Sequence, residues 1–122
     1  MGVPGTVAGL CYAEDHYGKL GLKTVMAPAI AMATHGIVVT QTLAAALRHS
    51  IRVLNVDPKT KALFSHDSRL LKQGERLKRP ALAKALTLIE QHGEKAFYKG
   101  AMAKAIIDQV HAFHGVMSMR DL

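Results

Sequence analysis

Apolar side chains recur at steps of three and four residues in several stretches of this chain, which is the spacing of one face of an α-helix. Leu43, Leu47, Ile51 and Leu54 form one such series, and residues 80–115 hold two more. Alanine, leucine, methionine and lysine dominate, and only 5% of the residues are aromatic, so the composition favours helices as well. The sequence therefore predicts an all-α protein that needs no strand ladder.

Glycines, prolines and capping residues divide the first half of the chain. We expect Thr6 to cap a first helix and Gly18 to end it in the left-handed conformation. A second helix contains Pro28, which either kinks it or starts its longer half, and closes at Gly36. After a short extended link, Thr40 caps the third helix with its stripe of leucines.

The second half of the chain is divided in the same way. Asp57 and Pro58 begin a short helix that runs to residue 64, and residues 65–78 form the longest predicted loop. Pro80 begins a helix that Gly93 ends. Residues 94–100 are predicted as a turn, and residues 101–115 as the last helix. Two faces are expected to point inward: Leu82, Leu86 and Ile89 in the helix from Pro80, and Met102, Ile106, Val110 and Phe113 in the last helix.

At 122 residues the chain is one domain or less, and alone it can bury roughly two thirds of its unfolded surface. Residues 27–33 are apolar on nearly all sides, as expected for a helix surrounded by protein. Ser118 and Asp121 have the spacing of a capping box, which indicates the start of a helix. We therefore expect residues 1–122 to form a single helical segment of a larger protein, with about five to six helices in an orthogonal or irregular bundle.

The net charge of +7 comes entirely from residues after Leu47. The densest basic run spans residues 69–84, which contain six lysines and arginines and a single acidic residue, Glu75. Such a run is typical of a nucleic-acid surface, yet no aromatic residue is interleaved for base stacking. A solvated loop and helix start explains it better, so we do not expect a nucleic-acid partner. The alternative function is a free-standing basic helical module that binds an acidic partner or nucleic acid through Arg76, Lys78 and Arg79.

Cys11 is the one cysteine, so it forms no internal disulfide and is expected to be a buried small hydrophobe. Thr24–Leu47 lacks charged side chains, but Pro28, His35 and Gly36 are among the residues that interrupt it, so no membrane span is predicted. The sequence also shows no basic start followed by an apolar stretch and a cleavage site.

Two groups of residues suggest chemistry, and neither of them makes a site. Asp108, His111 and His114 have the helical spacing of di-metal bundles, but such a site needs a second pair and two further carboxylates. A solvent-facing position near the negative helix end explains the histidines better. The glycines of residues 2–9 lack the spacing of a phosphate-binding loop. We therefore predict no catalytic, substrate-binding or metal-binding residue and no cofactor.

The order of several motifs resembles the gamma-glutamyltranspeptidase family. These motifs are "VPGTVAGL", "YGKL", "APAIAMATHGIVV", "GERLKRPALAKALTLIEQHGEKAFYKGAMAKAI" and "GVMSMRDL", and together they extend from Val3 to Leu122. The resemblance implies the helical middle of the large subunit of an N-terminal nucleophile hydrolase, whose fold is an αββα sandwich. It also implies a parent that transfers or hydrolyses gamma-glutamyl groups of glutathione-like substrates, and family members are typically periplasmic, secreted or extracellular-facing.

The catalytic groups implied by the resemblance do not fall in this chain. The family's threonine nucleophile opens the small subunit, where its own amine can act as the base. The arginine that holds the substrate carboxylate precedes the "VPGT" motif. Thr34 and His35 lie in the stretch that matches a large-subunit helix, so no nucleophile role carries over to them. We expect the chain alone to be inactive and its partners to be the remaining large subunit and the small catalytic subunit, or a second copy of itself.

Overall fold

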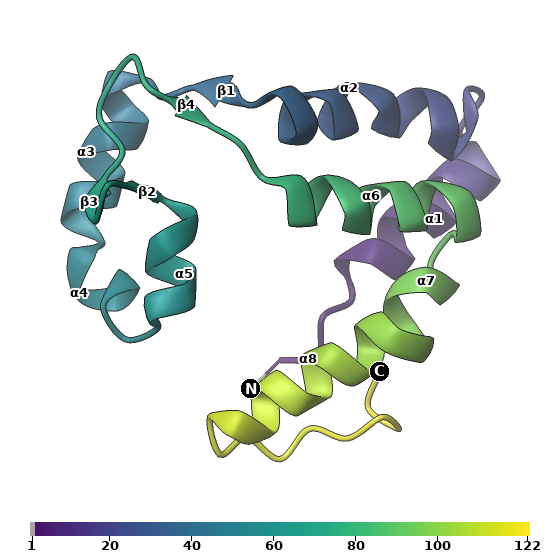
Figure 1. The fold of residues 1–122 in the computed structure, drawn as a ribbon. Helices are drawn as coiled ribbons and strands as arrows, with labels where there is room; N and C mark the ends of the chain where they lie inside the picture. The colour runs from purple at the N-terminus through teal and green to yellow at the C-terminus, as the bar shows by residue number, and fades with distance from the viewer. Residues whose placement is uncertain (1) are drawn as a thin grey trace. The chain divides into compact units, whose positions relative to one another are not determined.

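A computed structural model describes residues 2–122, and helices account for most of them (Figure 1). The described elements are α1 Thr6–Tyr17, α2 Gly21–His35, β1 Ile37–Val38, α3 Gln41–His49, α4 Ile51–Leu54, α5 Pro58–Leu63, β2 Ser65–His66, β3 Arg69–Leu70, β4 Arg76–Leu77, α6 Pro80–His92, α7 Lys95–Tyr98 and α8 Gly100–Ala112. The prediction of a mostly helical chain is confirmed. The expectation that no strands pair is wrong, because four short strands form two antiparallel pairs.

The described residues fall into two compact units. The first contains the chain up to Ile30 together with Lys84–Leu122, and the second is Ala31–Ala83. We call them the α1/α8 unit and the middle unit. Within residues 2–122, no helix is both long enough and apolar enough to cross a bilayer.

Several helix ends lie where the sequence predicts them. The Leu43 N–H donates to the Thr40 hydroxyl at 3.1 Å, and the Asp57 carboxylate accepts the N–H groups of Lys59 and Thr60 at 3.1 Å each. These two caps start α3 and α5. Gly36 follows α2 with a φ of +84°, a left-handed conformation that glycine adopts without steric cost.

Three predicted boundaries are wrong. Gly18 follows α1 in an extended conformation with φ −75°, and its N–H bonds the Glu14 carbonyl. Thr6 is the first residue of α1 and not its cap, since Gly5 occupies that position without a side-chain hydrogen bond. The third predicted helix is divided at Ser50 into α3 and α4, which together with α7 raises the number of described helices above six.

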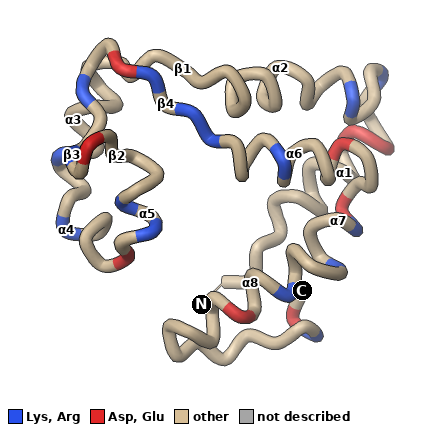
Figure 2. Tube along the Cα trace, viewed as in Figure 1, with Lys and Arg blue, Asp and Glu red and all other residues tan. Residues whose placement is uncertain are grey.

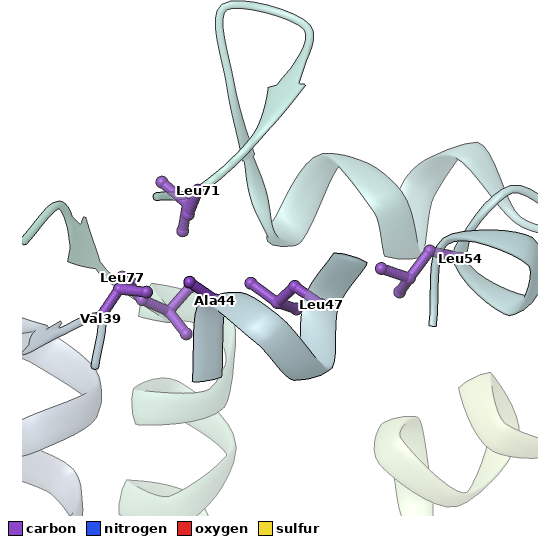
Figure 3. Close-up of a cluster of buried hydrophobic side chains, with 6 residues drawn as sticks. All are labelled: Val39, Ala44, Leu47, Leu54, Leu71 and Leu77. Carbon is purple, nitrogen blue, oxygen red and sulfur yellow. The ribbon is translucent and has the colours of Figure 1, made fainter. Parts of the chain in front are cut away.

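The core of the middle unit is a row of small and branched apolar side chains (Figure 3). Its buried members are Val39, Ala44, Leu47, Leu54, Leu71 and Leu77. Leu47 and Leu54 of the predicted stripe belong to this cluster and Leu43 packs against it, so the stripe does face a core. Val39 has no exposed surface at all, which places the link between β1 and α3 at the centre of this core.

Two short antiparallel pairs organise the segment predicted as a loop. β1 pairs with β4, with Ile37 opposite Leu77. β2 pairs with β3 through a turn at Asp67 and Ser68, whose φ values of +47° and +62° are those of a tight hairpin. The Val39 N–H and C=O also bond the backbone of Glu75 and Gly74, at 2.8 and 2.9 Å. Residues 65–78 are therefore an ordered part of the middle unit.

The α1/α8 unit has fewer buried residues, and its last helix is oriented differently from the prediction. Ala103 and Ile107 are the buried residues of α8. The predicted inner stripe of Met102, Ile106 and Val110 lines an open apolar groove with Phe113, which is 53% exposed. Ile89, in the part of α6 that belongs to this unit, is buried as predicted; in the part that belongs to the middle unit, Leu82 is exposed and Ala83 is buried.

Candidate functional site

Tyr98 joins the two motifs that carry most of the resemblance. Its hydroxyl donates to the Pro4 carbonyl at 2.7 Å and accepts the Ala8 N–H at 3.2 Å. Ala8 lies in the first turn of α1, where backbone N–H groups lack partners within the helix. Tyr98, 90 residues away from Ala8 in sequence, thus supplies the cap that Gly5 does not provide.

Sequence reasoning did not identify this role of Tyr98. The residue lies in "AFYKG", and Pro4 and Ala8 lie in "VPGTVAGL". Helical periodicity describes neighbours within a turn or two and carries no information on contacts across such a separation. The one available signal was the lack of a side-chain acceptor at Gly5, which requires a cap from elsewhere.

The lysines and arginines of the predicted basic run lie along β3, β4 and the start of α6 (Figure 2), and half of them contact other residues of the middle unit. The Arg69 guanidinium contacts the Glu75 carboxylate twice, at 2.6 and 3.0 Å. Arg76 donates to the Gly36 carbonyl at 3.0 Å, and the Arg79 guanidinium lies 5.1 Å from the centre of the Phe64 ring. Three of the six cations therefore stabilise local structure, which argues against the nucleic-acid interpretation of this run.

Glu75 bonds both a guanidinium and a backbone N–H group in the same segment. Its carboxylate accepts the Lys72 N–H at 2.7 Å in addition to the paired guanidinium of Arg69. These bonds favour the ionised form, so they lower the pKa of Glu75 from 4.5 to about 2. The same pairing raises the pKa of Arg69. The arrangement fixes the turn between β3 and β4.

The residues with metal-like spacing in α8 are used for other contacts. The Lys104 ammonium donates to both oxygens of Asp108, at 2.8 and 3.0 Å. The His111 Nε2 lies 2.8 Å from the Met117 carbonyl oxygen, and His114 adopts a φ of +60° beyond the helix. Across residues 2–122, no three histidine, cysteine, aspartate or glutamate side chains group closely enough to hold a metal ion.

Cys11 lies beside an apolar cavity of about 540 Å³. Its side chain is 5% exposed, so the prediction of a buried small hydrophobe is confirmed. Burial raises the pKa of the thiol, and the nearby Asp15 and Glu94 carboxylates raise it further. A thiol in this environment is largely protonated at neutral pH and is a poor nucleophile.

The predicted capping box near the end of the chain is present. The Asp121 carboxylate accepts the Ser118 N–H at 2.7 Å, and the Ser118 hydroxyl accepts the Arg120 N–H at 3.3 Å. The backbone and hydroxyl hydrogen bonds from Ser118 lower the pKa of Asp121. Thr34 lies within α2 and His35 ends it.

Comparison with known proteins gives a consistent result along the whole chain. The family model described as Gamma-glutamyltranspeptidase matches residues 1–122. Glutathione hydrolase 3 of Arabidopsis thaliana is 37% identical over 100% of this chain, which corresponds to 19% of that protein. The glutathione hydrolase proenzyme of Escherichia coli (strain K12) is 37% identical over 99% of this chain and 21% of its own length. The chain thus spans about a fifth of these relatives.

Solved structures give the same result. The crystal structure of the Helicobacter pylori gamma-glutamyltranspeptidase matches with a TM-score of 0.93 at 30% identity, over 98% of this chain and 35% of that one. The Bacillus anthracis transpeptidase enzyme CapD matches with a TM-score of 0.87 at 31% identity, over 99% of this chain and 41% of that one. Sequence and structure agree that this chain belongs to the gamma-glutamyltranspeptidase family.

Proposed function

We propose that this chain is a structural part of a protein that transfers or hydrolyses the gamma-glutamyl group of glutathione-like substrates. The observation that carries this proposal is the match of residues 1–122 to the family, with relatives named glutathione hydrolases. Those relatives are about five times as long as the matched segment. The activity is therefore proposed for the whole protein and not for these residues alone.

The chain would act in that protein as a single helical segment of an αββα N-terminal nucleophile hydrolase. The close structural match to the Helicobacter pylori enzyme supports this placement. The partners of the segment would be the rest of the large subunit and the small catalytic subunit. Its own contribution would be to hold the "VPGTVAGL" segment against α7 through Tyr98.

We expect the 122-residue chain to be inactive by itself. By the family resemblance, the threonine nucleophile and the substrate-binding arginine belong to other parts of the protein. In the described residues, Cys11, Glu75 and Asp108 are buried or already paired, so they offer no substitute.

A chromogenic gamma-glutamyl amide tests both parts of the proposal. The full-length polypeptide should release the chromophore, and the purified 122-residue chain should release none above the buffer blank. A full-length protein that folds and matures but leaves the amide intact would overturn the proposed activity. Release by the isolated chain at a rate that survives further purification would overturn its assignment as a purely structural segment.

A further inference from the structure

The positive charge of the molecule is concentrated in the middle unit. Ala31–Ala83 contains nine lysines and arginines against three acidic residues, and so it holds six of the seven net charges. All three acids already have partners within the unit. Asp57 caps α5, Asp67 lies 3.7 Å from the His66 ring nitrogen, and Glu75 binds Arg69. Among the described residues, Arg69 is the only lysine or arginine of this unit in an ion pair with a carboxylate, so the other cations of the unit lack such a partner.

Two such cations lie on the exposed side of α3 and α4. Backbone bonds from Ser50 N–H to Ala46 and from Leu54 N–H to Ser50 continue the helical turns through the junction. Each residue turns the helix by about 100°, so the side opposite the buried residues Leu47 and Leu54 is defined by sequence position. It consists of Arg48, His49, Arg52 and Val53. We add the exposed Val56 from the turn after α4 and call these five residues the Arg48 face.

The Arg48 face combines charge with exposed apolar surface. Val53 of α4 and Val56 in the turn that follows α4 are 73% and 69% exposed, so both contribute apolar surface to this face. Arg48 and Arg52 are exposed beside them, four residues apart. An apolar centre next to arginines is the composition of a protein-binding surface, whereas a nucleic-acid surface adds aromatic or polar groups for the bases.

We propose that the Arg48 face binds an acidic protein surface, in which apolar side chains cover the two valines and carboxylates pair with the two arginines. The inference goes beyond the proposed gamma-glutamyl chemistry and does not depend on it. Arginine suits this role, because its planar guanidinium binds carboxylates in a bidentate way and is weakly hydrated.

The test measures binding of a fluorescent amphipathic peptide, made of one glutamate face and one leucine face, to the full-length polypeptide at low salt. Binding should weaken as salt is added. Arg48→Glu with Arg52→Glu should weaken it about tenfold or more, because like charges then face each other. Lys19→Glu with Lys23→Glu is the matched control, since it makes the same charge change in exposed residues of the other unit.

A second variant separates the apolar contribution from the charge. Val53→Asn with Val56→Asn should weaken binding of the amphipathic peptide and leave binding of poly-L-glutamate unchanged. Circular dichroism of each variant checks that the helices persist. The proposal is overturned if the peptide does not bind, if the control pair weakens binding equally, or if a DNA duplex binds as tightly and with the same response to Arg48→Glu and Arg52→Glu.

Discussion

At Gly36, two segments of the middle unit that are far apart in sequence come close together. Its φ of +84° ends α2 and turns the chain into β1. A Cβ atom at this position would lie 2.8 Å from the Leu77 carbonyl oxygen and 2.7 Å from Cγ of Lys78. The backbone of β4 therefore approaches Gly36 more closely than any other residue type allows.

The substitution Gly36→Ala should destabilise the protein for two reasons. A left-handed alanine and an overpacked contact together cost about 2–4 kcal/mol in unfolding free energy. Gly74→Ala is the matched control, because Gly74 has a φ of +87° but open space around the added carbon, and its cost should be only about 1–2 kcal/mol. Urea unfolding of both variants measures the difference. If the two variants lose the same unfolding free energy, the contact with β4 does not constrain position 36.

Tyr98→Phe tests the cap of α1. The substitution keeps the ring but leaves the Ala8 N–H and the Pro4 carbonyl without the hydroxyl that bonds both. Loss of bonds to partly buried groups should cost about 1–2 kcal/mol in unfolding free energy. Tyr17→Phe is the control, since Tyr17 is 78% exposed and should tolerate the change. Thermal unfolding of the two variants compares them, and equal midpoints would contradict the role assigned to Tyr98.

At the scale of the elements, the sequence predicts the helices well and the pairing of the strands poorly. Thr40, Asp57 and Gly36 act within a turn of their own position, so local chemistry locates the ends of α2, α3 and α5. The strands are two residues long, and β1 finds β4 across nearly forty residues, which no local pattern encodes. The same limit explains why the sequence does not predict the contacts of Tyr98 with Pro4 and Ala8.

The turn between β3 and β4 should make stability depend on pH. The folded pKa of Glu75 is about 2, below its ordinary value of 4.5. Its contribution is therefore fully present above pH 4.5 and is lost as the pH falls from 4.5 toward about 2. Asp57 and Asp121, whose pKa values are also lowered, add to the same trend. As the pH falls across this range, the thermal midpoint should fall less steeply for Glu75→Gln than for the unmodified chain. Parallel curves for the two proteins would show that Glu75 does not contribute to the pH dependence of stability.

At the scale of the whole molecule, the two units differ in charge but share an excess of exposed apolar surface. In the α1/α8 unit, Leu10, Tyr17 and Val116 are 66%, 78% and 90% exposed. The groove along α8 and the cavity beside Cys11 are apolar as well. Surfaces of this kind are usually covered by other protein. This agrees with a chain that spans about a fifth of its curated relatives.

The last prediction concerns what covers these surfaces when the 122 residues are studied alone. We expect the helical circular dichroism signal to melt at a midpoint that rises with protein concentration, because association of copies buries the exposed apolar faces and favours the folded state by mass action. Two samples that differ about a hundredfold in concentration suffice, since that ratio changes the association term by roughly 2.7 kcal/mol. The full-length polypeptide should show no such shift if its own segments cover the same faces. A cooperative melt of the 122 residues that is independent of concentration would instead show a self-sufficient domain, and a broad loss of helix at both concentrations would show that these residues need the rest of the protein to pack.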